Sequence, residues 1–244
     1  MQVLLHPVPN KALGALLLCI GLALFFIPWD TVKHRIMGRR TTSDAIRLYG
    51  AAAESRLTPS FEKAGVAYPP EKVVLLAFKQ EARVELWAGR GSNLAHIRDY
   101  PILAASGDPG PKKQEGDRQV PEGVYRIEGL NPNSGYHLSM KVDYPNERDR
   151  TVATAESRDN LGGDIFIHGS NVSIGCLAMG NPAIEELFTL AAKTGYAKVE
   201  VVIAPCDFRV NSMDCAPIPD ETTRELYVQL QDVLMRFPVT EPAT

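Results

Sequence analysis

The most informative stretch of this chain is HGSNVSIGCLAM, residues 168–179. It begins with His168, directly after the short apolar run DIFI, and carries Cys176 behind a glycine. A cysteine attacks as its thiolate, and a free thiol with a pKa near 8.5 is mostly protonated at neutral pH. A neighbouring imidazole can take that proton, so the segment is a candidate nucleophile–base pair. Gly169 and Gly175 would let the backbone approach a substrate, and N–H groups there could bind a developing oxyanion.

The same residues allow two simpler interpretations. A cysteine in an apolar segment that contains glycine is more often a small buried hydrophobe than a nucleophile. A zinc site is the other interpretation, but the chain has no C-x-x-C pair and no H-x-x-x-H pair. We therefore expect no metal and no cofactor. From the residues alone, packing is a more common role for Cys176 than catalysis.

The surrounding pattern predicts a mostly-β domain. Residues 72–79 (KVVLLAFK) and 83–89 (RVELWAG) have the composition or alternation of strands, and a turn between them would make a hairpin. Further strands are predicted at 95–106, 120–127, 135–144, 164–167 and 198–204, with an exposed loop at 107–119 and an irregular segment at 145–159. Helices are predicted at 181–195 and 219–237. Many short strands with one or two helices favour this class over alternating strand–helix units.

An uncharged apolar run, ALGALLLCIGLALFFIPW, occupies residues 12–29. A helix of this length can just cross a hydrocarbon core of about 30 Å, so we expect a signal-anchor helix in the inner membrane. A cleaved signal peptide, lipidation at Cys19 and a buried soluble helix are the alternatives. Four basic residues follow the run between positions 33 and 40, against Lys11 before it. By the positive-inside rule, this charge pattern alone places the rest of the chain in the cytoplasm.

The remaining composition sets broader limits. Residues 31–70 are predicted to form a stalk with a helix at 44–57, for which Ser43 is a plausible N-cap. The net charge of −3 gives no indication of a nucleic-acid partner, which usually requires a basic face. The chain has four cysteines, and Cys206 and Cys215 flank a short polar loop. In an oxidising compartment these two could form a disulfide, although their spacing alone also allows two unpaired thiols.

Several motifs in the same order resemble one known family. HGSNVSIGCLAM resembles the signature of the YkuD-type L,D-transpeptidase catalytic domain, in which an HG dipeptide precedes Ser/Thr-His-Gly-Cys, an aliphatic residue and Arg. Here the spacer is shorter, Ile174 replaces the histidine and Ala178 replaces the arginine, as in the YafK-like branch. PKKQEGDRQVPEGVYRI, SGYHLSMKVDYPNERDR and the helix after Met179 also resemble that branch. The resemblance spans roughly residues 72–204.

The resemblance implies a β-sandwich with the cysteine in a loop ahead of one helix. The expected organisation is a signal-anchor segment at 1–30, the stalk at 31–70, the catalytic domain at 71–205 and a C-terminal extension with an amphipathic helix at 206–244. Cys176 matches the family's nucleophile and His168 its general base. Ser173 is expected to shape the turn or to form a hydrogen bond near the histidine, and not to react. The N–H groups of Gly175 and Cys176 are oxyanion-hole candidates.

Substrate contacts are expected from four positions. Gly169 would lie close to the substrate backbone. Arg209 could replace the missing family arginine and bind a substrate carboxylate, or it could be a solvated loop residue. Lys113 could line the mouth of the cleft or lie in a solvated loop, and Tyr144 could contact substrate or form structural hydrogen bonds.

The resemblance implies an L,D-transpeptidase of the cell envelope whose substrate is a peptidoglycan stem peptide. Cys176 would form a thioester with the third stem residue, and an amine would then accept the acyl group. That amine could belong to another stem peptide, a free D-amino acid or a wall-anchored lipoprotein. Hydrolysis by the same residues and a non-catalytic wall-binding module are the alternative functions. A periplasmic catalytic domain is expected, in conflict with the charge pattern around residues 12–29.

Overall fold

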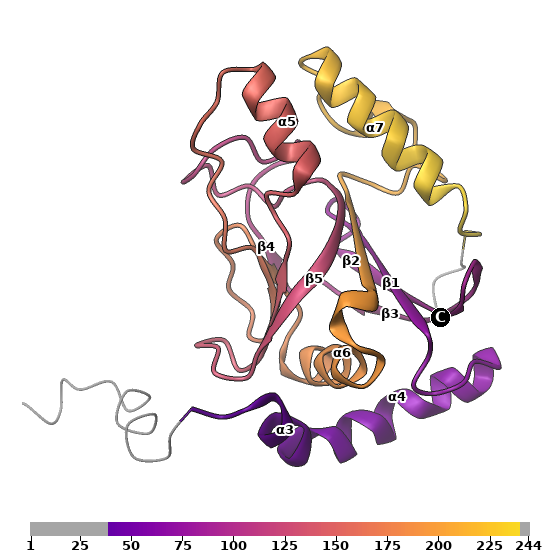
Figure 1. The fold of residues 1–244 in the computed structure, drawn as a ribbon. Helices are drawn as coiled ribbons and strands as arrows, with labels where there is room; N and C mark the ends of the chain where they lie inside the picture. The colour runs from indigo at the N-terminus through magenta and orange to yellow at the C-terminus, as the bar shows by residue number, and fades with distance from the viewer. Residues whose placement is uncertain (1–38, 240–244) are drawn as a thin grey trace, which may run out of the picture. The chain divides into compact units, whose positions relative to one another are not determined.

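The computed structural model describes residues 39–239, and this part of the chain is built around a nine-stranded sheet (Figure 1). The strands lie in the order β3-β2-β1-β9-β5-β6-β7-β8-β4. Their bounds are β1 Lys72–Phe78, β2 Arg83–Arg90, β3 Asn93–Pro101, β4 Ala104–Ala105, β5 Gly123–Asn131, β6 Ser139–Val142, β7 Phe166–His168, β8 Leu177–Ala178 and β9 Val199–Ala204. The predicted mostly-β class is confirmed.

Strand β5 joins the two halves of this sheet. Its first residues pair with β9 and its last residues pair with β6, and the register shifts between Ile127 and Gly129. Such a shift bends a strand, so the sheet can curl at β5. The pairs β1–β9 and β7–β8 are parallel, whereas the other paired strands are antiparallel. The hairpin of β1 and β2 was predicted; its parallel neighbour β9 was not.

Helices cover both faces of the sheet. The helices have the bounds α3 Thr42–Ala45, η1 Ile46–Gly50, α4 Ala51–Ala64, α5 Glu147–Ala155, α6 Asn181–Thr194, η2 Tyr196–Lys198, η3 Met213–Cys215 and α7 Glu221–Leu234. Buried residues of α4 and α6 share one hydrophobic cluster, and those of α7 share a second cluster with the opposite side of β1 and β9. In Figure 1, α4 and α6 accordingly lie below the strands while α7 lies above them.

Between residues 71 and 205 the structure has two α-helices, of which α6 was predicted and α5 was not. Helix α5 forms within residues 145–159, which were predicted to be irregular. The side chain of Asn146 accepts a hydrogen bond from the N–H of Asp149, whose carboxylate accepts one from the N–H of Asn146. This reciprocal cap can start a helix without a strong apolar face, and of the helix's residues only Ala153 is buried.

The predicted stalk also differs from the structure. Residues 42–64 form a continuous helical segment, and its cap is Thr41 rather than Ser43. Ala53, Leu57 and Phe61 are buried in the main hydrophobic cluster. Their spacing of about one helical turn puts them on one face, which packs against α6 and β3. This helix is therefore part of the folded unit that begins at Thr41.

Two predictions concern the cysteines and the membrane. Cys206 and Cys215 form a disulfide with a Cα–Cα distance of 6.4 Å, which ties the end of β9 to the loop before α7. Between residues 39 and 239, no helix is both long enough and apolar enough to span a membrane. The predicted span at 12–29, together with Cys19, lies outside the described residues.

Candidate active site

Two short parallel strands bring the predicted nucleophile and base together. Ile167 of β7 lies opposite Leu177 of β8, and His168 lies opposite Ala178. Successive side chains in a strand point to opposite faces. Cys176 directly precedes β8, so its side chain shares a face with that of His168 and lies diagonally across from it. The sequence-local motif is thus also a spatial pair.

The imidazole of His168 is oriented by its own backbone neighbour. The side chain is buried, and Nδ1 lies 2.6 Å from the carbonyl oxygen of Gly169. A carbonyl can only accept, so Nδ1 carries the proton and Nε2 of the neutral ring is free to accept one. The ring of Tyr136 stacks on the imidazole at a centroid distance of 4.6 Å. Burial lowers the pKa of His168, although the hydrogen bond to Gly169 opposes that shift, so the ring is neutral at neutral pH.

The Cys176 thiol is partly buried and is the free cysteine of the described region. Burial raises the pKa of Cys176, the negative charge of Asp164 raises it further, and a backbone hydrogen bond with Phe166 acts in the opposite direction. Sγ lies 3.8 Å from the carbonyl oxygen of Asp164. The resting pair is therefore a neutral thiol beside a neutral imidazole. Attack by such a thiol on a carbonyl would require a base to take its proton, and Nε2 of His168 is a candidate.

The turn before Cys176 is held by hydroxyl groups. Ser173 Oγ accepts from the Cys176 N–H at 3.0 Å and donates to the Cys176 carbonyl at 2.6 Å. Ser173 thus closes the turn, one of the two roles expected for it. Gly175 has a φ of +93°, a conformation that a side chain would strain, and its N–H donates to Ser106 Oγ at 2.5 Å. Both N–H groups predicted to form the oxyanion hole are therefore already occupied by hydroxyl oxygens.

A pocket of about 200 Å³ opens beside the imidazole. Backbone and side chains from the end of β5, from β6 and from the connection between them form most of its wall. It is lined by Asn131, Asn133, Ser134, Gly135, Tyr136, Ser139, Phe166 and His168. Gly169 does not line this pocket. A Cβ at Gly169 would lie 2.7 Å from the carbonyl oxygen of Tyr136 and 2.7 Å from Asn181 Oδ1, so this glycine permits close backbone packing behind the base.

Arg209 does not lie at this site. Its side chain is 2% exposed, and its guanidinium forms ion pairs with Glu85 of β2 and with Asp207. Strands β1, β9, β5 and β6 separate β2 from β7 in the sheet. A buried guanidinium with both partners in place has no charge left for a substrate carboxylate. The prediction that Arg209 replaces the family arginine is therefore wrong, and so is the alternative of a solvated loop residue.

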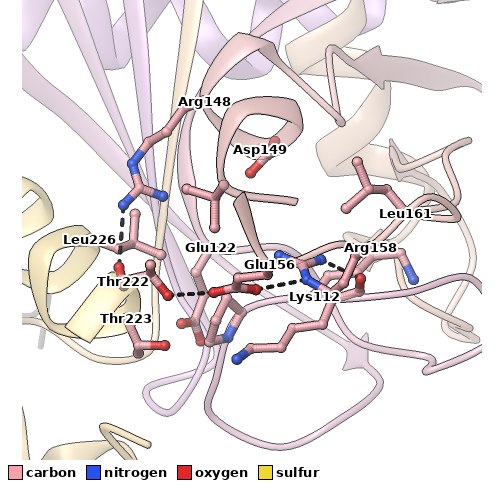
Figure 2. Close-up of a pocket in the computed structure, with 13 residues that line it drawn as sticks. Lys112, Glu122, Arg148, Asp149, Glu156, Arg158, Leu161, Thr222, Thr223 and Leu226 are labelled. Atoms are coloured by element: carbon pink, nitrogen blue, oxygen red, sulfur yellow. Dashed lines mark hydrogen bonds and ion pairs between the residues drawn. The ribbon is translucent and has the colours of Figure 1, made fainter. Parts of the chain in front are cut away.

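Lys113 lies in a different, smaller pocket of about 30 Å³. Figure 2 shows this pocket, in which a chain of contacts runs from Arg148 through Thr222 and Glu156 to Arg158. Lys113 Nζ forms an ion pair with Asp220 at 2.6 Å, and neither His168 nor Cys176 lines the pocket. Residues of α5, α7 and the 107–119 loop line this small pocket, and their charges are paired. In the structure, Lys113 thus links the 107–119 loop to Asp220, the N-cap of α7.

Tyr144 has a structural hydrogen bond. Its hydroxyl donates to the carbonyl oxygen of Leu161 at 3.1 Å, and its ring meets that of Tyr125 edge to face. The side chain is 4% exposed. Of its two predicted roles, the contacts fit the structural one.

Two residues near the pair were not predicted. Tyr136 stacks on His168 from the loop before β6, and Ser106 contacts Gly175 from the end of β4. Neither carries a recognisable local motif, because each reaches the site through strand pairing with a distant segment. The stretch SGYHLSMKVDYPNERDR, which includes Tyr136, was the one available signal, and it pointed to the branch without assigning this residue a role.

Comparison with known proteins supports the assignment made from the motif. Residues 72–203, more than half of the chain, match the family model for YkuD, the L,D-transpeptidase catalytic domain. The chain belongs to the YkuD L,D-transpeptidase family. YafK of Escherichia coli (strain K12) is 36% identical over 138 residues, a match that covers 54% of this chain and 54% of YafK. The matched region thus spans about half the length of this relative.

Two solved structures of lower identity were also found. The helical cell shape determining protein Pgp2 from Campylobacter jejuni is 18% identical, covers 68% of this chain and 70% of its own, and has a TM-score of 0.46. L,D-transpeptidase 1 of Mycobacterium tuberculosis is 12% identical, covers 55% of this chain and 62% of its own, and has a TM-score of 0.31. The family assignment rests on the family model, with YafK as the nearer of these relatives in sequence.

Proposed function

We propose that this protein is a cysteine-dependent L,D-transpeptidase that acts on peptidoglycan stem peptides through a thioester on Cys176. The observation that carries the proposal is the placement of Cys176 and a neutral His168 on one sheet face, with a pocket that His168 helps to line. Membership of the YkuD family supplies the substrate class. Asn and Ser side chains in the pocket offer the donors and acceptors that a peptide backbone requires.

The chemistry follows from the two neutral groups. As Sγ of Cys176 attacks the carbonyl of the third stem residue, Nε2 of His168 takes the thiol proton. The tetrahedral intermediate then collapses, and His168 returns the proton to the departing amine of the terminal D-amino acid. A second amine attacks the thioester and loses its proton to His168. The carbon–sulfur bond then breaks, a new amide forms, and His168 returns the proton to the departing thiolate of Cys176. The acceptor is a second stem peptide, a free D-amino acid or the amine of a wall-anchored lipoprotein.

We place the catalytic domain in the periplasm, anchored through residues 12–29. The Cys206–Cys215 disulfide supports this location, because such bonds persist in oxidising compartments and are rare in the cytosol. This argument opposes the basic residues between positions 33 and 40. A phosphatase reporter fused after the C-terminus should be active, since that reporter works only outside the cytoplasm. Activity of a cytoplasmic reporter alone at this position would exclude the proposed location.

Mass spectrometry of the full-length protein with a disaccharide tetrapeptide tests the function. We expect a cross-linked dimer or an exchanged terminal D-amino acid, together with a thioester on Cys176, and loss of all three in Cys176→Ala. Release of a wall-linked protein or cleavage of a cross-link, without any transfer product, would identify a hydrolase that uses the same two residues. Peptide binding without a thioester would reduce the protein to a wall-binding module.

A further inference from the structure

The N–H groups of Gly175 and Cys176, which were predicted to bind the oxyanion, already donate to the hydroxyl groups of Ser106 and Ser173. Ser173 lies three residues before Cys176, and its hydroxyl group hydrogen-bonds to both the N–H and the carbonyl group of Cys176. Ser106 differs, because it comes from another strand and its hydroxyl hydrogen is directed to the carbonyl of Arg118 at 2.7 Å. The oxygen of this hydroxyl accepts from the Gly175 N–H, and its hydrogen is donated to the Arg118 carbonyl.

Strand pairing places Ser106 on the reacting face. The ladder between β4 and β8 ends with Ala105 opposite Leu177, so Ser106 directly follows its last pair on one strand and Cys176 directly precedes it on the other. Continued by one residue, this ladder would set Ser106 opposite Cys176. Residues directly opposite in an antiparallel pair project to the same face. In this register, Ser106 and Cys176 share a face with His168, which lies diagonally across from Cys176 on β7. The hydrogen bond from the Gly175 N–H to Ser106 Oγ agrees with this placement.

We propose that Ser106 is a catalytic residue whose hydroxyl donates to the oxyanion formed during attack by Cys176. The inference rests on the proposed acyl-transfer chemistry. The Gly175 N–H keeps Oγ in place, and rotation about the Cβ–Oγ bond moves only the hydrogen, from the Arg118 carbonyl to the substrate oxygen. An amide that donates into Oγ polarises the O–H bond and strengthens it as a donor.

The rotation costs little elsewhere in the molecule. The bond between Ser106 and the Arg118 carbonyl is exposed, so water can replace the hydroxyl there. Gly175 keeps its hydrogen bond and its positive φ throughout, so the turn that presents Cys176 stays unchanged. When the intermediate collapses, the carbonyl re-forms and the hydroxyl returns to Arg118. The hydroxyl proton is never transferred, and the moving proton remains the one shared by Cys176 and His168.

The test compares two reactions of the same thiol in the full-length protein. Acylation by p-nitrophenyl acetate passes through an oxyanion and expels p-nitrophenolate. Alkylation by iodoacetamide displaces iodide at a saturated carbon and forms no oxyanion. We expect Ser106→Ala to slow acylation of Cys176 about 100- to 1,000-fold, the usual effect of losing one oxyanion donor, and to leave alkylation within about twofold. Ser106→Thr retains a hydroxyl and should restore acylation to within about tenfold.

Ser55→Ala is the matched control, because that exposed hydroxyl donates only within its own helix, to the Ala52 carbonyl. It should change neither rate. Unchanged acylation in Ser106→Ala would overturn the proposal, and so would an equal loss of acylation and alkylation, which would show an effect on the thiol itself. The ester probe is not a wall peptide. If acylation by the ester depends on Ser106 but the wild-type protein gives no product from the wall peptide, only the proposed substrate is refuted. If the ester acylates the wild-type protein no faster than it acylates Cys176→Ala, both the proposed function and the role of Ser106 are refuted.

Discussion

Replacement of Arg209 by methionine should strongly lower the free energy of unfolding of this protein without changing its catalytic activity. Arg209, Glu85 and Asp207 have side chains that are 2%, 0% and 1% exposed. Arg209 donates to both oxygens of each carboxylate over distances of 2.6–3.0 Å. Methionine fills a similar volume but removes the charge. Glu85 and Asp207 then stay buried with Arg83 as their shared cation.

The expected loss follows from this burial. Breaking a buried ion pair by removal of one partner costs about 3–5 kcal/mol, because the remaining charge stays desolvated. For a domain of this size, 1 kcal/mol corresponds to about 2–4 °C, so the midpoint of thermal unfolding should fall by about 6–20 °C. Arg209→Lys keeps the charge but not the planar fork, and its loss should be smaller. Arg224, 54% exposed beside Glu221, is the control, and Arg224→Met should change stability by less than about 1 kcal/mol.

The assay pairs calorimetry with kinetics of the folded variants at low temperature. We expect kcat/KM of Arg209→Met to stay within about twofold of the wild-type value. A variant with unchanged stability and a raised KM for the stem peptide would refute the reasoning. That result would return Arg209 to the role of a substrate-binding cation.

Three further predictions concern the site and the disulfide. The acid limb of kcat/KM should have its midpoint below about 6.5, because burial lowers the pKa of His168 and only the neutral ring accepts a proton; a midpoint above 7 would contradict this. Gly169→Ala should cost about 1–3 kcal/mol in urea unfolding and reduce acylation of Cys176, since its Cβ has no room behind the base; a fully active, equally stable variant would exclude such tight packing. Replacing Cys206 and Cys215 by alanine should cost about 2–3 kcal/mol, the loop-closure entropy for a separation of nine residues, and an unchanged midpoint would show that the loop is held by other contacts.

Local patterns predicted the parts of the fold that depend on neighbouring residues. The hairpin of β1 and β2 follows from two short strand-like runs and a turn, and α7 follows from its apolar periodicity. Helix α5 was missed because it has almost no apolar face, although its capping residues, Asn146 and Asp149, can be recognised in the sequence. Helix α4 was assigned to a stalk because its buried face becomes apparent only once α6 and β3 are placed against it.

In the site, too, the residues that are close in sequence were predicted and those brought in from distant segments were not. His168 and Cys176 lie eight residues apart, so a motif could find them. Ser106 directly follows β4, and Tyr136 lies in the loop before β6. These two strands lie far apart in the sequence but flank β7 and β8 in the sheet. Arg209 was misplaced for the opposite reason. A charged residue in a loop-like segment suggests exposure, and only the fold shows Glu85 and Asp207 closing around it.

The neutral state of the pair would suit the proposed periplasmic location, where a thiol is exposed to oxidants. Burial disfavours charge on both groups, which lowers the pKa of His168 and raises that of Cys176, so little thiolate exists at rest. Oxidation and disulfide exchange proceed through the thiolate, so a protonated Cys176 resists both. Its charge arises only during attack, when it passes to the substrate oxygen on the face that Ser106 shares. Stabilisation at that oxygen, rather than a preformed ion pair, must then supply much of the rate.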